Sequence, residues 1–206
     1  MNQELKQYVE TTIIPKYEMF DKAHNRTHVC TVIAESLILA KDYPLNTNMV
    51  YTIAAYHDLG LCKDRATHHL VSGEILENDK MLYRWFTEEE IRVMKEADRA
   101  SSDHEPRSIY GKIVAEADRI IDPEITLRRT VQYGLKQNPA ENTEWHYNRF
   151  LNHLLNKYAE GGYLKLWFEH SKNGEKLREL RSLINNREEL RNVFNKIFEE
   201  ETNLQI

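Results

Sequence analysis

Glycine and proline are scarce in this chain, and their scarcity limits the folds it can adopt. Only 7 of its 206 residues are Gly and 5 are Pro, about half of the ~7% and ~5% typical of globular proteins. A β-rich protein of this length needs turn residues at short intervals, which this chain does not supply. We therefore predict an all-α fold, and the length suits one domain or one domain with an appendage.

Apolar residues recur at three- and four-residue steps, as on the inner face of amphipathic helices. The predicted helices span about 3–20 (broken near Pro15), 27–41, 47–60, 67–78, 88–100, 109–121, 123–138 and 141–159, with two or three more after Gly161-Gly162. Thr27 is the expected N-cap of the second helix, and Thr87 with Glu90 fits a capping box. We expect a first domain at 1–138 and a C-terminal helical extension at 139–206, packed on the same domain.

Charge and cysteine content bear on partners and location. The 28 Lys and Arg against 33 Asp and Glu give a net charge of −5, which argues against duplex nucleic acid as the main partner. No apolar run approaches the ~18 residues of a membrane span, and the first residues do not resemble a signal peptide. Cys30 and Cys62 fit reduced thiols better than a disulfide framework, so we expect a cytoplasmic protein.

Four residues stand out by their positions. His28 opens the second predicted helix, His57 and Asp58 end the third, and Asp118 falls on the inner face of a later helix. A buried carboxylate is costly without a partner, and a metal ion is one adequate partner. Two imidazoles and two carboxylates could converge on one divalent cation. Alternatively, Asp118 pairs with an arginine such as Arg119 and His28 caps a helix, since a lone His-Asp dipeptide is weak evidence.

The order and surroundings of these residues resemble the HD superfamily of metal-dependent phosphohydrolases. YTIAAYHDLG is similar to the family's helix that ends in His-Asp, and IVAEADRI around Asp118 is similar to its closing aspartate helix. The likeness covers about residues 24–122. The chain also resembles uncharacterised bacterial HD-domain proteins that carry a helical C-terminal extension with a segment like KYAEGGYLKLW. The resemblance implies an HD-type helical bundle with His28, His57, Asp58 and Asp118 as metal ligands.

Such a ligand set suits Mn²⁺, Fe²⁺, Co²⁺, Ni²⁺ or Zn²⁺ and does not distinguish them from one another or from Mg²⁺. A bound ion would lower the pKa of a water and polarise a phosphoryl oxygen. Two-metal relatives carry a further His where this chain reads Ala97-Asp98-Arg99, and the nearby His104 falls on a predicted loop. We therefore expect one ion per chain, although Asp98 could ligate a second through oxygen.

The expected catalytic residues are Asp58, His69 and Asp64. His69 shares a helix face with Ser72, and several HD subfamilies place a His there as a second-metal ligand or phosphate contact; His69 fits this position better than His68. Asp64 could orient the attacking water or bind a second ion. The alternatives are an exposed His at a helix start and a surface ion pair between Asp64 and its basic neighbours.

Several side chains are candidates for contacts to the substrate. The expected phosphate-binding residues are Lys63, Arg65, Arg99 and Ser102. A basic stripe in the extension could also receive phosphate or could be a solvated face: His146, Arg149 and His153. Two aromatic residues that could stack on a base are expected in the core instead: Tyr163 and Trp167.

We therefore predict a metal-dependent phosphohydrolase that uses a metal-activated water to hydrolyse a phosphate ester. A nucleotide is the first candidate substrate because many HD enzymes act on nucleotides. A homodimer is compatible with the amphipathic faces of the last third. The alternatives are a non-catalytic nucleotide-sensing or regulatory HD module and an HD-fold di-metal oxygenase or lyase, which the missing histidine disfavours.

Overall fold

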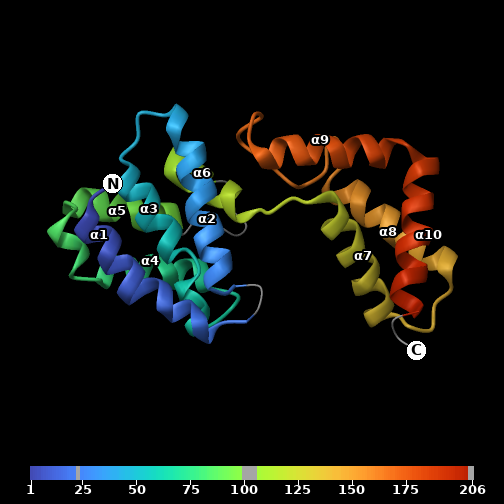
Figure 1. The fold of residues 1–206 in the computed structure, drawn as a ribbon, viewed down its shortest axis with the longest axis horizontal. Helices are drawn as coiled ribbons and strands as arrows, with labels where there is room; N and C mark the ends of the chain where they lie inside the picture. The colour runs from blue at the N-terminus through green and yellow to red at the C-terminus, as the bar shows by residue number, and fades with distance from the viewer. Residues whose placement is uncertain (22–23, 99–105, 204–206) are drawn as a thin grey trace. The chain divides into compact units, whose positions relative to one another are not determined.

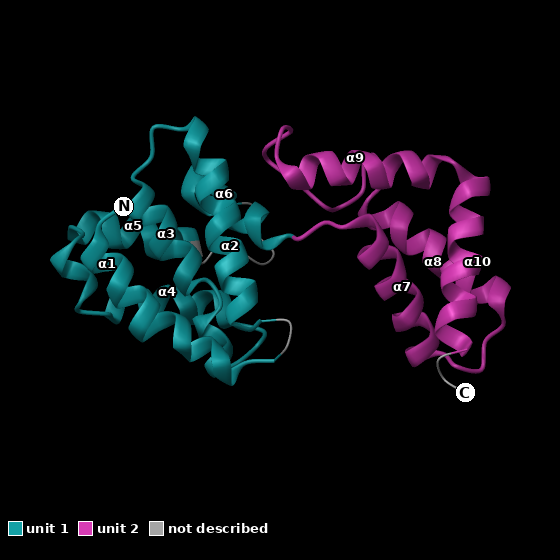
Figure 2. Cartoon of the chain, viewed as in Figure 1, with its two compact units in different colours: residues 1–119 teal, residues 120–206 magenta. Residues whose placement is uncertain are grey.

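The computed structural model describes residues 1–21, 24–98 and 106–203 (Figure 1). Within these ranges the regular structure is helical throughout and no strand occurs, so the all-α prediction is confirmed. None of the helices in the described ranges is both long enough and apolar enough to cross a membrane. The chain divides into two compact units, residues 1–119 and 120–206 (Figure 2).

The described residues of unit 1 form six α-helices, several of which are connected through short π- or 3-10-helical stretches. The six α-helices are α1 (Gln3–Tyr8), α2 (Arg26–Leu39), α3 (Thr47–Tyr56), α4 (His68–Asn78), α5 (Glu88–Asp98) and α6 (Ile109–Asp118). The break expected near Pro15 is present, because a π-helical stretch, Val9–Ile13, leads into a 3-10 helix, Ile14–Met19. Pro15 has no N–H for an α-helical hydrogen bond, so an uninterrupted α-helix cannot pass through it.

Side-chain caps define where several helices of unit 1 begin. The Asn25 side chain accepts a hydrogen bond from the His28 N–H, so α2 starts one residue before the predicted helix and its cap is not Thr27. The capping box is confirmed, since the Glu90 N–H donates to Thr87 Oγ1 and the Thr87 N–H donates to a Glu90 carboxylate oxygen. The Asn25 cap fixes the first turn of α2, which carries His28, and the capping box fixes the start of α5.

The core of unit 1 brings together the ends of helices that are far apart in sequence. Helix α2 contacts both α3 and α6, and α3 also contacts α6. Their contacting faces bury the apolar positions predicted from the periodicity, including Val32, Ile53 and Val114. As a result, the first turn of α2, the residues after α3 and the last residue of α6 lie next to one another.

Unit 2 is a separate helical bundle with its own core. Its helices are α7 (Pro123–Gln137), α8 (Thr143–Lys157), α9 (Lys172–Asn185) and α10 (Arg187–Asn203). Phe150, Leu180 and Phe194 are fully buried at its centre. Each helix contributes an amphipathic face to this core.

The boundary between the units lies earlier than the sequence suggested. We expected 123–138 to belong to the first domain, but Leu127, Val131 and Leu135 of α7 are buried in the core of unit 2. Periodicity shows that α7 has an apolar face, but it does not show which core that face joins. The packing of the extension on the first domain stays a prediction.

Candidate metal centre

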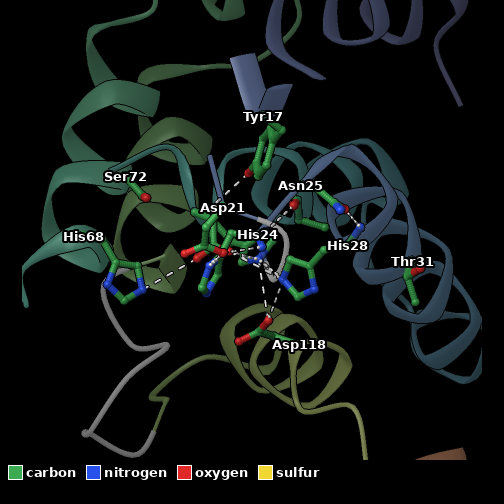
Figure 3. Close-up of polar contacts among 12 residues, drawn as sticks. Tyr17, Asp21, His24, Asn25, His28, Thr31, His68, Ser72 and Asp118 are labelled. Carbon is green, nitrogen blue, oxygen red and sulfur yellow. Dashed lines mark hydrogen bonds and ion pairs between the residues drawn. The ribbon is translucent and has the colours of Figure 1, made fainter. Parts of the chain in front are cut away.

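The four predicted metal ligands lie where the ends of three helices of unit 1 meet. Two of them, His28 and Asp118, are labelled in Figure 3. His28 is in the first turn of α2, His57 and Asp58 directly follow α3, and Asp118 is the last residue of α6. His57 and Asp58 are only 1% and 4% exposed, whereas the Asp118 side chain is 34% exposed. Within the cluster, His57 and Asp58 are therefore buried, and the carboxylate of Asp118 is partly accessible to solvent.

The potential ligand atoms of these residues converge. His28 Nε2 lies 3.3 Å from His57 Nε2 and 3.1 Å from Asp118 Oδ1. Asp58 Oδ2 lies 3.2 Å from His57 Nε2 and 3.5 Å from His28 Nε2. The ligand atoms of His28, His57 and Asp58 all lie within 4.8 Å of one another, an arrangement that could hold a metal ion.

Hydrogen bonding orients His57 for this role. Its Nδ1 lies 2.8 Å from the carbonyl oxygen of Ala54, so Nδ1–H donates to that carbonyl and Nε2 faces the cluster. Metal-binding histidines commonly use such a bond from the second ring nitrogen to fix the tautomer. Asp58 Oδ2 is buried and accepts no hydrogen bond of good geometry. A buried carboxylate oxygen of this kind fits a cation.

The electrostatics of the cluster favour added positive charge. Burial alone would lower the pKa of His28, but the nearby carboxylates of Asp118 and Asp58 raise it to about 9. The same carboxylates raise the pKa of His57 in spite of its burial. Burial alone would raise the pKa values of Asp58 and Asp118, but the two imidazoles lower them. Two ionised carboxylates thus face two imidazoles, and either protons or a metal ion can supply the balancing charge.

Residues 25–121 match the family model of the HD domain. This part of the chain, somewhat less than half of it, is similar to the HD domain. The match coincides closely with residues 24–122, over which the sequence resembles that superfamily. HD domains are mostly metal-dependent phosphohydrolases and bind divalent metals. Searches of the curated proteins and of the solved structures each found no match.

The HD domain places His68 near the cluster. His68 Nε2 lies 3.6 Å from Asp58 Oδ1, and His68 Nδ1 lies 2.7 Å from the carbonyl oxygen of Arg65, which fixes the ring (Figure 3). Sequence reasoning preferred His69 because it shares a face with Ser72. His68 and Ser72, four residues apart, share a face equally well. The role of His69, whose ring centroid lies 5.6 Å from that of His68, stays a prediction.

Ser72 has a structural partner within the HD domain. Its hydroxyl accepts a hydrogen bond from the Gly60 N–H at 2.9 Å, and the side chain is fully buried. A Cβ atom at Gly60 would overlap the carbonyl oxygen of His68. The glycine after the His-Asp dipeptide therefore permits α4 to lie directly against the turn that carries Asp58.

Sequence reasoning did not single out His24 or Asp21. His24 Nδ1 lies 2.8 Å from Asp21 Oδ1, and its ring centroid lies 5.9 Å from that of His28. His24 precedes His28 by four residues, a spacing that could have drawn attention to it. No local sequence pattern indicated that Asp21 would lie beside His24.

Three other predicted residues lie on the connection between α3 and α4. Asp64 is exposed, and its Oδ2 accepts hydrogen bonds from the N–H and hydroxyl of Thr67 just before α4. A hydrogen bond from the Ala66 backbone, together with those from Thr67, lowers the pKa of Asp64. Arg65 is exposed and pairs with Asp21 at 3.5 Å, and Lys63 is exposed. Asp64 thus has a local structural partner, while the catalytic and phosphate-binding roles of these residues stay predictions.

Some predicted residues lie outside the described part of the chain. The phosphate-binding candidates in this group are Arg99 and Ser102, and His104 belongs to it as well. The backbone of Asp98 ends α5, but its side chain is not described. Their predicted roles are unchanged.

The candidates of unit 2 are mostly engaged within that unit. His146 is 3% exposed, and the Arg149 guanidinium donates to the Thr130 carbonyl oxygen at 3.0 Å. The stripe on α8 is therefore not an open, solvated surface. The expectation of a core position is wrong for Tyr163, which is 66% exposed, whereas Trp167 is partly buried.

Proposed function

We infer that this protein is a metal-dependent phosphohydrolase that hydrolyses a small phosphate ester, with nucleotides as the first substrates to test. The observation that carries the proposal is the convergence of two imidazole Nε2 atoms and two carboxylates at the ends of α2, α3 and α6. A mixed set of nitrogen and oxygen ligands suits a divalent transition metal.

The residues proposed to hold the ion are His28, His57, Asp58 and Asp118. Among the described residues, the buried Asp58 Oδ2 accepts no hydrogen bond of good geometry. Both this oxygen and the fixed tautomer of His57 fit the assignment. When bound, a divalent cation supplies Lewis-acid activation of water and of a phosphoryl oxygen. The partial exposure of Asp118 leaves one side of the cluster open to a substrate.

One side chain that can transfer a proton, His68, lies beside this cluster. His68 Nδ1–H donates to the Arg65 carbonyl oxygen, which leaves Nε2 to accept or deliver a proton next to Asp58. We assign His68 the role of contacting the phosphate or protonating the leaving oxygen. Lys63 and Arg65 are the proposed cationic contacts to phosphate, because both are exposed on the connection that leads to His68.

The test combines metal analysis with a panel of phosphomonoesters, phosphodiesters and nucleotides in Mn²⁺. We expect a bound divalent ion and hydrolysis of at least one ester class. Replacing Asp58 with Ala should remove the ion and lower the rate more than about 100-fold. Asp42→Ala, which removes an exposed aspartate of the same unit, is the matched control and should behave as wild type.

Two outcomes would contradict the enzyme assignment. A wild-type protein that binds no divalent ion, or an Asp58→Ala variant with wild-type turnover, removes its basis. A protein that binds the ion but hydrolyses no member of the panel would instead favour a regulatory HD module.

A further inference from the structure

The C-terminal end of α3 is capped by two side chains. The last carbonyl groups of a helix lack hydrogen-bond partners within the helix. Here the Ala54 carbonyl accepts from His57 Nδ1–H at 2.8 Å, and the Ala55 carbonyl accepts from the Tyr17 hydroxyl at 3.0 Å. The Asp58 N–H in turn donates to the oxygen of the same hydroxyl at 3.3 Å. The turn that carries His57 and Asp58 is therefore held from outside the helix.

Tyr17 reaches this turn from a part of the chain that precedes the family match. It lies in the 3-10 helix Ile14–Met19, whereas the match begins at residue 25. Its side chain is fully buried, and its ring centroid lies 6.3 Å from that of His57 (Figure 3). The hydroxyl acts as donor to Ala55 and acceptor from Asp58, so it links the last turn of α3 to the residue after it.

We propose that Tyr17 is a positioning residue for the metal centre. This proposal rests on the metal site assigned above. The Tyr17 hydroxyl accepts a hydrogen bond from the Asp58 backbone N–H, and that backbone sets the point from which the Asp58 side chain extends into the cluster. Residues that orient metal ligands through hydrogen bonds commonly contribute strongly to metal affinity, because a small displacement of a ligand weakens its coordination.

Two other tyrosines provide matched comparisons. The Tyr8 hydroxyl, also from the N-terminal segment, donates to Asp79 Oδ2 at 2.6 Å. The hydroxyl of Tyr56, the last residue of α3, donates to the same oxygen at 2.6 Å, and this bond remains when Tyr8 is replaced. The Tyr51 hydroxyl in α3 is buried and makes no hydrogen bond. Tyr8→Phe thus removes one hydrogen bond from the same segment, and Tyr51→Phe removes a buried hydroxyl without removing a hydrogen bond.

The experiment compares Tyr17→Phe, Tyr8→Phe and Tyr51→Phe in the full chain. Each protein is stripped with EDTA and titrated with Mn²⁺ by calorimetry and with Co²⁺ by visible absorption, and urea unfolding in EDTA reports stability separately. We expect Tyr17→Phe to weaken Mn²⁺ binding by roughly 10-fold and to change the Co²⁺ absorption band. The other two variants should stay within about twofold of the wild-type Kd, although Tyr8→Phe should lose stability.

A wild-type Kd and Co²⁺ spectrum for Tyr17→Phe would overturn the proposal. An equal loss of affinity in Tyr8→Phe would also overturn it, because the effect would then be a general loosening of the N-terminal segment. If the wild-type chain binds no ion, both the proposed metal site and the positioning role of Tyr17 are contradicted. If the affinities follow the prediction but no phosphate ester is hydrolysed, the positioning role stands and the proposed activity fails.

Discussion

The two units each bury a histidine, and the contrast between these residues shows what marks a site. His57 in unit 1 is 1% exposed and His146 in unit 2 is 3% exposed. Burial and the nearby Arg149 lower the pKa of His146, whose ring lies 5.4 Å from that of Phe198. The pKa of His57 is raised because Asp118 and Asp58 outweigh its burial. The two histidines are about equally buried, but their pKa values shift in opposite directions. The neighbouring carboxylates therefore distinguish the candidate ligand, His57, from the core residue, His146.

The largest expected effect separates these two histidines. His57→Ala removes a proposed ligand and should weaken Mn²⁺ binding by more than about 100-fold. His146→Ala should change the Kd by less than about twofold, because it alters only the core of unit 2. Calorimetric titration of both variants checks this. A similar loss of affinity in the two would break the distinction between the units.

The adjacent histidines of α4 give a second, smaller contrast. If the chain hydrolyses phosphate esters, His68→Ala should lower kcat by about 100-fold, because a positioned acid or base contributes at least that much. His69→Ala should have less effect, since His68 is the residue fixed by the Arg65 carbonyl beside Asp58. Steady-state kinetics decides between them, and a larger loss in His69→Ala would restore the assignment made from sequence.

The pH dependence of metal binding tests the charge balance of the cluster. The pKa of His28 is raised from 6.5 to about 9 by the carboxylates, so in EDTA its contribution to stability is present below pH 6.5 and lost as the pH approaches 9. Metal binding must displace this proton and that of His57, whose pKa is also raised, so affinity should rise by at least about tenfold per pH unit below pH 9. Titrations at pH 6, 7 and 8 measure the slope. An affinity that falls with rising pH would contradict the assignment of His28 as a ligand.

The smallest expected effects come from helix caps, where the two units should behave alike. Thr87 caps α5 in unit 1, and Ser171 caps α9 in unit 2 by accepting from the Gly174 N–H at 2.9 Å. Replacing either residue with Ala should cost about 1 kcal/mol of unfolding free energy. Urea unfolding measures that loss, and the Mn²⁺ Kd should stay unchanged. A marked loss of affinity in Ser171→Ala would show that the site depends on unit 2.

Local sequence patterns could predict the helices, because helical periodicity and caps depend on short-range spacing. The four proposed ligands are far apart in the sequence, and it was the resemblance to the HD superfamily that implied them. The Thr87–Glu90 capping box and the inner-face position of Val114 follow from residues three or four apart. The site's support could not be predicted in this way. Tyr17 contacts residues 38 and 41 positions away in sequence, and no local pattern indicates those contacts.

The division of the chain shows the same limit. An apolar stripe predicts that α7 is amphipathic, but contacts with α8, α9 and α10 decide that it joins the second core. For His68 and His69, helical spacing allowed either residue to share a face with Ser72. The hydrogen bond to the Arg65 carbonyl decides which ring lies near Asp58.

The central claim is that residues at the ends of α2, α3 and α6 jointly hold a divalent ion. Asp118 tests it most directly because it is the proposed ligand from α6. Calorimetric titration of EDTA-stripped protein with Mn²⁺ should give one ion per wild-type chain. Asp118→Asn preserves the side-chain shape but removes the charge, and it should weaken binding by at least about tenfold, whereas the exposed control Asp42→Asn should not. Wild-type affinity in Asp118→Asn, or no binding to the wild-type chain, would contradict the claim.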